Sequence, residues 1–323
     1  MTDTAQIGLA TPEAPEPGLR EFISLLKPRV MSLVIFTALA AMFAAPSGVH
    51  PIEAFSALIC IAVGAGAAGA LNMWWDADID AEMTRTRARA VPMGMVEPGE
   101  ARNFGLGLAL LSVMVLGVVS NWLAAGLLAF TIFFYVVIYT IWLKRWTPQN
   151  IVIGGAAGAF PPIVAWAAVT GDVALAPILM FLIIFLWTPP HFWALALWRC
   201  RDYAGVSVPM LPVVAGDAAT RRQILLYTIL MVPVTISPAF TEAGGPIYAA
   251  VAVYVSAVFL RDALRVARRT EAMAEADRYA AEKRLFGFSI VFLFALFGAF
   301  IADAALRVAL AAAGVTAAWP VWF

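Results

Sequence analysis

Three oxygen-bearing side chains, Asn72, Asp76 and Asp80, recur every four residues at the end of an apolar segment. In a helix this spacing places all three on one face, one turn apart. Neighbouring carboxylates repel each other unless a cation lies between them, and oxygen ligands suit Mg²⁺, which completes its shell with water and substrate phosphates. The spacing therefore predicts a magnesium site for a phosphate-bearing substrate. The alternative is a solvated loop or helix start, where Asp and Asn are also common.

Basic side chains follow this acidic segment in the sequence. Arg85 and Arg89 come directly after it, and Lys144 and Arg145 close a later apolar segment that also contains Tyr139. Guanidinium groups bind phosphate oxygens through two parallel donors. We therefore expect these residues to bind substrate phosphates. The alternative is that the basic residues only mark the cytoplasmic side of a membrane protein.

A second polar site is expected within residues 187–203. His191 follows two prolines and stands among aromatic residues, while Asp202 has Arg199 and Tyr203 as basic and aromatic neighbours. A lone histidine is more often a structural group than a ligand, but the proline break and the polar loop favour a functional role. We predict that the two sites are two walls of one polar pocket, above an apolar interior that could hold an isoprenoid tail.

The composition indicates that these residues belong to a membrane protein. Of the 323 residues, 63% are hydrophobic and 13% are charged, whereas soluble domains are about 45–50% apolar and about 25% charged. These values exclude a soluble enzyme, a disordered chain and a disulfide scaffold. Nine segments are long and apolar enough to span a bilayer as helices: 30–47, 54–73, 104–120, 123–142, 151–170, 174–194, 223–241, 246–261 and 285–305.

The lysines and arginines predict the orientation of the nine spans. With the N-terminus in the cytoplasm, 20 of the 21 basic residues fall on the cytoplasmic side, and only Arg307 does not. Residues 1–22 are polar and lack the pattern of a signal peptide, which indicates a cytoplasmic tail. Residues 306–323 extend the last span and end in tryptophans, which predicts a periplasmic interfacial anchor. The prediction is a bacterial inner-membrane protein with one domain at 23–305, cytoplasmic active-site loops and no nucleic-acid partner.

Several segments together carry a resemblance to a known family. The Asn-x-x-x-Asp-x-x-x-Asp motif at 72–80 resembles that of the UbiA superfamily of intramembrane prenyltransferases. Three segments resemble its haem-farnesylating branch: LKPRV at 26–30, YTIWLKRWTPQNIVIGGAAGAFPP at 139–162 and WTPPHFWALALWRCRDYAGVSVPMLPVV at 187–214. The resemblance extends over residues 23–302 and implies an all-α fold, with helices around a central cavity and a cytoplasmic cap.

The resemblance also implies a reaction. The substrates would be farnesyl diphosphate and haem b, and the product would be haem O. Asn72, Asp76 and Asp80 would hold Mg²⁺, and Asp202 would belong to a second acidic site. His191 stands where quinone-type relatives carry an acid, which fits a porphyrin acceptor. Two roles stay open for His191: axial ligand of the haem iron, or base toward the water that hydrates the product.

Other functions are open on the sequence alone. One is a prenyltransferase that makes a quinone, chlorophyll or lipid precursor. Another is a transporter or haem carrier without chemistry, and a third is a haem-handling assembly subunit. The acidic residues cluster at one membrane face, which disfavours transport because transporters hold their ions near the midplane. A second copy of the chain and haem A synthase are the expected protein partners.

Overall fold

The computed structural model describes residues 17–46, 50–200, 205, 208–315 and 319–322, and within them every regular element is a helix. The first half contains α1 (Leu19–Leu25), α2 (Pro28–Ala44), α3 (Pro51–Trp75), α4 (Ala77–Glu82), α5 (Pro98–Val119), α6 (Trp122–Phe133), the π-helix η1 (Phe134–Trp142) and the 3₁₀ turn η2 (Leu143–Arg145). The second half contains α7 (Asn150–Ala159), α8 (Pro161–Thr170), α9 (Leu175–Trp198), α11 (Leu211–Ala215), α12 (Asp217–Ile236), η3 (Ser237–Phe240), α13 (Pro246–Ala267), α14 (Glu271–Ala276) and α15 (Ala280–Ala312).

The helices agree with a polytopic membrane protein. Among the described residues, eight helical segments are long and apolar enough to cross a bilayer. The remaining predicted span, 30–47, is the first in the chain and corresponds to α2. The apolar part of α2, Met31–Ala44, is shorter than these eight segments. Two of the eight segments are composite: α6 continues through η1 and η2, and α7 continues into α8. The all-α prediction is therefore confirmed; eight of the nine expected spans match helical segments long enough to cross a bilayer, and the span expected at 30–47 matches the shorter helix α2.

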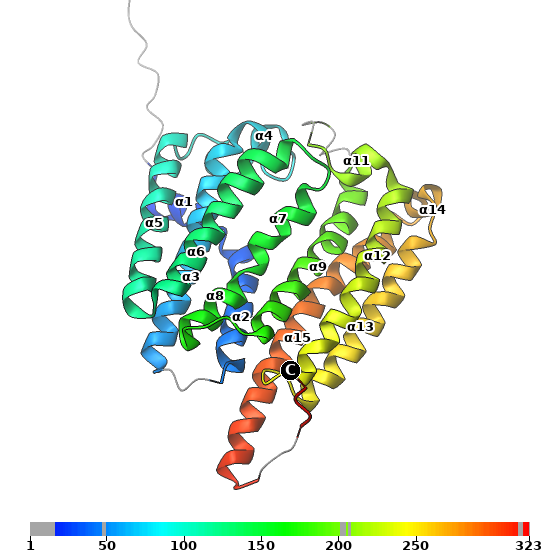
Figure 1. The fold of residues 1–323 in the computed structure, drawn as a ribbon. Coiled ribbons are helices and arrows are strands. Elements are labelled where there is room, and N and C mark those ends of the chain that lie inside the picture. The colour runs from blue at the N-terminus through cyan, green and yellow to red at the C-terminus, as the bar shows by residue number, and fades with distance from the viewer. Residues whose placement is uncertain (1–16, 47–49, 201–204, 206–207, 316–318, 323) are drawn as a thin grey trace, which may run out of the picture.

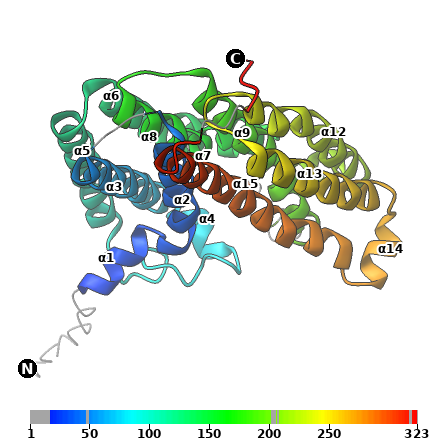
Figure 2. The same ribbon diagram turned by 90° about the horizontal axis from the view of Figure 1, so that it is seen from below.

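These spanning segments form a closed ring. Each contacts the next along the chain, from α2 through α3, α5, α6, α7–α8, α9, α12 and α13 to α15, and α15 packs back against α2. Figure 2 shows α3 and α5 at one end of this arrangement and α12 and α13 at the other. Helix α8 also contacts α2 and α3. Segments that are distant in the sequence therefore meet at the centre of the ring.

Prolines determine where several of these helices begin. A proline occupies the first position of α2, α3, α5, α8 and α13. Proline suits this position because its missing N–H would have no partner there and its φ angle is already helical. Helix α8 ends at Gly171, whose φ of 74° is left-handed and favours glycine. Local sequence therefore accounts for the starts of these five helices and for the end of α8.

The C-terminal helix is longer than the bilayer requires. Its 33 residues extend about 50 Å, beyond a hydrocarbon core of about 30 Å. Helix α15 begins at Ala280, earlier than the predicted span, and projects beyond the other helices at the end opposite α4 and α11 (Figure 1). The predicted aromatic anchor then folds back onto η3. Trp319 Nε1 donates to the carbonyl oxygen of Ala239 at 2.6 Å, and the ring of Trp322 stacks on Phe240 at 4.3 Å.

Candidate active site

The helix that carries the acidic motif breaks at its central aspartate. Helix α3 ends at Trp75, Asp76 has φ −90° and ψ 10°, and α4 begins at the next residue. The i to i+4 hydrogen bonds continue through the break, because Asp76 N donates to Asn72 O at 3.0 Å and Asp80 N donates to Asp76 O at 2.8 Å. The three side chains therefore lie one turn apart. All three are buried, with at most 5% of their surface exposed.

Two basic residues of η2 reach this acidic face. Lys144 forms an ion pair with Asp76 Oδ2. Arg145 binds both carboxylate oxygens of the exposed Asp78 at 2.7 and 2.8 Å, and its Nη2 lies 3.9 Å from Asp76 Oδ1. The hydrogen bond from Arg145 lowers the pKa of the Asp78 carboxyl. The end of the composite segment α6–η1–η2 therefore places two cations beside the end of α3.

A lysine outside the predicted site completes this arrangement. Lys27 Nζ donates to Asn72 Oδ1 at 2.7 Å, and its backbone has a left-handed φ of 52° at the start of α2. Such a φ is uncommon for a residue with a side chain. Burial, followed by the positive charge of Arg89, lowers the pKa of the Lys27 ammonium to about 7. The sequence offered one signal for this residue, its position before a proline at a helix start.

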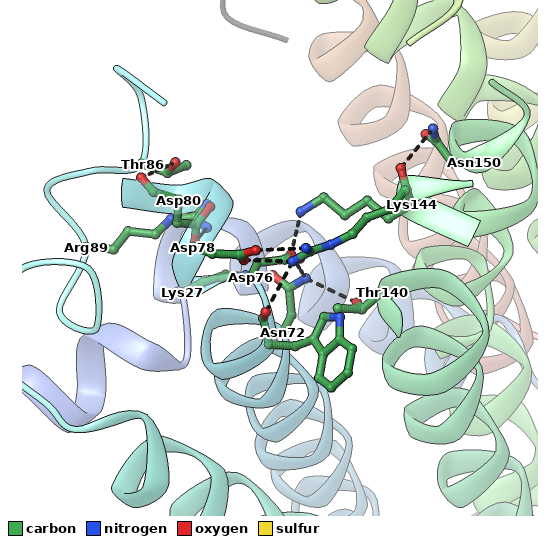
Figure 3. A network of polar contacts seen from close by, with 12 residues as sticks. Lys27, Asn72, Asp76, Asp78, Asp80, Thr86, Arg89, Thr140, Lys144 and Asn150 are labelled. Atoms are coloured by element: carbon green, nitrogen blue, oxygen red, sulfur yellow. Dashed lines mark hydrogen bonds and ion pairs between the residues drawn. The ribbon is translucent and has the colours of Figure 1, made fainter. Parts of the chain in front are cut away.

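These groups form one connected set of polar contacts. Arg89 Nη1 lies 2.5 Å from Asp80 Oδ2. Asn72 Nδ2 donates to Asp76 Oδ2 at 2.6 Å and to Thr140 Oγ1 at 3.1 Å. Figure 3 shows how these side chains converge from α3, α4, η1 and η2. The polar cluster, as the term is used below, consists of Lys27, Asn72, Asp76, Asp80, Arg89, Thr140, Lys144 and Arg145.

A π-helix positions one side of the polar cluster. Element η1 carries Thr140 and Tyr139, and π-helical turns are frequently found at functional sites. A Cβ atom on Gly154 would lie 2.2 Å from the ring of Tyr139, so only glycine lets α7 approach this ring. Gly154 therefore serves close packing between α7 and η1, as small residues do between membrane helices. The sequence predicts that Tyr139 binds substrate, and in the structure its ring packs against Gly154.

Gly154→Ala should destabilise the protein by about 1–3 kcal/mol, because the added methyl group forces the ring of Tyr139 and its π-helix to move. The measurement is the thermal unfolding temperature of the purified protein in detergent. Gly158→Ala is the matched control on the same helix, because a Cβ there meets no atom within 4 Å. The packing argument is wrong if the two variants unfold at the same temperature.

An apolar cavity opens directly beneath the polar cluster. Its volume is about 140 Å³, roughly ten times what one water molecule needs, so it is more than a packing defect. Lys27 and Gly69 line it beside the cluster, and Ile61 and Val164 line it further along their helices. The remaining lining residues are Leu26, Met31, Val34, Ala65, Ala68, Leu128, Thr131, Ile132, Tyr135, Ala157, Gly158 and Pro161. Its walls come from α2, α3, α6, η1, α7 and α8.

The donors of the polar cluster fit a magnesium ion that has few protein ligands. Asp76 Oδ1 is buried and accepts no hydrogen bond in the part of the chain that the structure describes. Asp80 supplies a second buried carboxylate and Asn72 an amide oxygen, and such hard oxygen ligands suit Mg²⁺. Across the same residues, no group of three His, Cys, Asp or Glu side chains gathers as a complete metal cage. An ion here would need ligands from water or substrate.

Comparison with known proteins identifies the family. The model of the UbiA prenyltransferase family matches residues 33–290. The chain belongs to the UbiA prenyltransferase family. Relatives named protoheme IX farnesyltransferase include one from Jannaschia sp. (strain CCS1), 57% identical over 95% of this chain and 99% of that protein. Another, from Ruegeria pomeroyi, is 58% identical over 90% of this chain and 92% of that protein.

Solved structures show the UbiA fold in proteins of low sequence similarity. A digeranylgeranylglyceryl phosphate synthase structure has a TM-score of 0.71 at 15% identity, covering 88% of this chain and 98% of that one. A UbiA homolog from Archaeoglobus fulgidus, bound to GPP and Mg²⁺, has a TM-score of 0.58 at 13% identity, covering 87% of this chain and 99% of that one. These likenesses support the fold of this UbiA chain as a multi-pass membrane protein.

In this UbiA chain, His191 lies in an aromatic environment away from the polar cluster. Its ring stacks between Trp187, at 4.3 Å, and Phe286, at 4.5 Å. Its Nδ1 lies 2.6 Å from Ser289 Oγ of α15. The residue is 9% exposed. The sequence suggested the polar loop as its partner, whereas the contacts described here come from α9 and α15.

The other predicted site residues occupy varied positions in the UbiA fold. Arg85 is exposed and joins no ion pair among the described residues, and Arg199 caps the C-terminal end of α9. Asp202 and Tyr203 lie outside the described residues. The two walls predicted for the polar pocket come from elements that lie next to each other. One apolar cluster joins α4, α7, the end of α9 and the segment before α11. It consists of Ile79, Met83, Ile151, Ala196, Val208 and Met210.

Proposed function

We propose that this UbiA protein transfers the farnesyl group of farnesyl diphosphate to a vinyl group of haem b. The C1–O bond of farnesyl diphosphate breaks, a bond forms between C1 and the vinyl carbon, and one water adds as a hydroxyl group, giving haem O and diphosphate. The main support is a pair of buried carboxylates, Asp76 and Asp80, matched with partly exposed cations at the mouth of an apolar cavity, in a chain 57% identical to a protoheme IX farnesyltransferase. Transport and the making of a quinone, chlorophyll or lipid precursor have no comparable support.

The acidic side of the polar cluster would hold Mg²⁺. Asp76 and Asp80 would bind it through carboxylate oxygens, Asn72 through its amide oxygen, and Asp202 is proposed for the second acidic site. When bound, the ion stabilises negative charge on the diphosphate as the C1–O bond breaks. Burial of both carboxylates excludes water, so their interaction with a cation is stronger than it would be at an exposed site.

The basic side of the cluster would bind the diphosphate. Lys144, Arg145 and Arg89 pair with the acids in this structure, so their positions beside the motif are already fixed. Donors fixed before the reaction stabilise developing charge without a cost of reorganisation. We propose that Arg85 and Lys27 also bind the diphosphate. Tyr139, Arg199 and Tyr203 stay predicted substrate contacts.

The cavity would hold the farnesyl chain. Gly69 lines it beside the polar cluster and Ile61 lies eight residues earlier on α3, which corresponds to a depth of about 12 Å along the helix. The lining is almost wholly apolar, and apolar burial contributes about 0.8 kcal/mol per CH₂ group. A chain of isoprenoid units entering this cavity would place its diphosphate at Lys27 and Asn72. His191 is the proposed contact for haem.

We also propose the bacterial inner membrane as the location, with the N-terminus and the polar cluster on the cytoplasmic side. The support is the basic-residue pattern, because Lys27, Arg89, Lys144 and Arg145 gather around the acidic motif at the end of α3. Farnesyl diphosphate is a charged molecule, so an opening on the cytoplasmic side gives it direct access. A second copy of the chain and haem A synthase stay predicted partners.

Purified protein given farnesyl diphosphate and haem b should yield a haem heavier by one farnesyl group and one hydroxyl group, detected by mass spectrometry. Chelation of divalent metal should abolish the product, and added Mg²⁺ should restore it, because the buried carboxylates need a cation to act on the diphosphate. An aromatic quinone precursor in place of haem is the control acceptor. Prenylation of that acceptor alone would refute the proposed function, and metal-independent turnover would refute the magnesium site.

A further inference from the structure

We propose that Ser289 is a positioning residue that fixes the tautomer of His191, with the proton on Nδ1 and the lone pair on Nε2. Ser289 lies on α15 and His191 on α9, and the two residues are 98 positions apart in the sequence. The catalytic meaning of this arrangement rests on the proposed function. The tautomer itself follows from the hydrogen bonds alone.

The hydroxyl of Ser289 contacts two groups at the same distance. Its Oγ lies 2.6 Å from His191 Nδ1 and 2.6 Å from the carbonyl oxygen of Phe286. A serine hydroxyl has one proton to donate, and a carbonyl oxygen can only accept. The short contact with Phe286 therefore requires the proton to lie on that side. The serine oxygen is left as an acceptor, so Nδ1 of His191 must be the donor.

The surroundings of His191 favour a neutral ring held in one plane. The rings of Trp187 and Phe286 both stack on the imidazole ring of His191, at interplanar angles of 18° and 22°. Burying a charged imidazolium between aromatic faces without an ionic partner is costly. Trp187 Nε1 also donates to the backbone oxygen of Ser289 at 2.8 Å. One residue of α15 therefore fixes both the histidine and one of its stacking partners.

A neutral histidine with its proton on Nδ1 has an unprotonated Nε2. Among the described residues, only Nδ1 of His191 has a hydrogen-bonding partner. Both roles proposed for this histidine, ligand of the haem iron and base toward water, need a nitrogen lone pair. The opposite tautomer would offer an N–H group, which can do neither. Ser289 would therefore set the chemistry of His191 without touching substrate.

The tautomer can be read directly, because the chain contains two histidines. In the His50→Gln variant, ¹⁵N-histidine labelling reports on His191 alone. The expected spectrum shows a protonated Nδ1 and an unprotonated Nε2. In Ser289→Ala we expect a mixture of tautomers. Because partners that orient a ligand typically contribute 10–100-fold, kcat should fall by about 10- to 100-fold, with an unchanged KM for farnesyl diphosphate. Ser289→Thr, which keeps the hydroxyl, should restore the Nδ1-protonated form and most of kcat.

Ser256→Ala is the matched control, since Ser256 is equally buried on a neighbouring helix and its hydroxyl has no partner among the described residues. It should leave the tautomer and kcat unchanged. A proton on Nε2 in the His50→Gln protein, or an unchanged tautomer in Ser289→Ala, would overturn the proposal. The expected tautomer in a protein that does not farnesylate haem would support this inference and refute the proposed function alone.

Discussion

Asp76→Asn is expected to reduce turnover by about a thousandfold or more, the largest effect of any single substitution in this chain. The carboxylate is fully buried, pairs with Lys144 and has an oxygen without a hydrogen-bonding partner among the described residues. Its loss removes a magnesium ligand from the point where charge develops, and such electrostatic contributions reach about 10²–10³-fold even for a single neutral donor. The measurement is kcat for haem farnesylation under saturating Mg²⁺.

The same substitution also leaves Lys144, whose side chain is 19% exposed, without its ion-pair partner, which costs about 1–3 kcal/mol. The double variant Asp76→Asn/Lys144→Met separates the two effects, because it removes both charges together. We expect it to recover thermal stability and to remain inactive. Recovery of activity in the double variant would contradict the assignment of Asp76 as a metal ligand. Asp78→Asn, at an exposed position in the same segment, should lose at most about tenfold in turnover.

Gly158→Leu is expected to raise the KM for farnesyl diphosphate by about a hundredfold or more. Gly158 lines the cavity, and a Cβ there meets no atom within 4 Å, so a leucine side chain can start at this position without a clash at its first carbon. It would exclude one isoprenoid unit from the cavity. Burial of five carbons contributes about 4 kcal/mol, equivalent to a factor of about 10³. Dimethylallyl diphosphate, with a single unit, should be used as well by this variant as by the unmodified protein.

Gly126→Leu is the control for this experiment. Gly126 lies on α6, also has open space around its Cβ, and does not line the cavity. It should leave the KM for farnesyl diphosphate within about twofold, the scatter expected of a surface substitution. An equal rise in KM for the long and the short diphosphate in Gly158→Leu would contradict the placement of the chain in this cavity.

Local features of the sequence determined the membrane class, the helices and the spacing of the acidic motif. A run of apolar residues must form a helix in lipid because its backbone groups have no other partners. The helical period then places Asn72, Asp76 and Asp80 one turn apart, and the structure keeps that spacing even though the helix breaks at the central residue. The family could be inferred as well, because its motifs are short segments of contiguous chain.

Only the tertiary structure decided which distant groups meet. Asn72 contacts Thr140 from 68 residues away and Lys27 from 45, and His191 contacts Ser289 from 98. Ser289 lies outside the segments that carry the family resemblance, and no pattern within the segments of Lys27 and Thr140 pairs either residue with Asn72. Their roles follow from the closure of the ring, in which packing of α15 against α9, and of η1 against α3, brings single side chains within hydrogen-bonding distance.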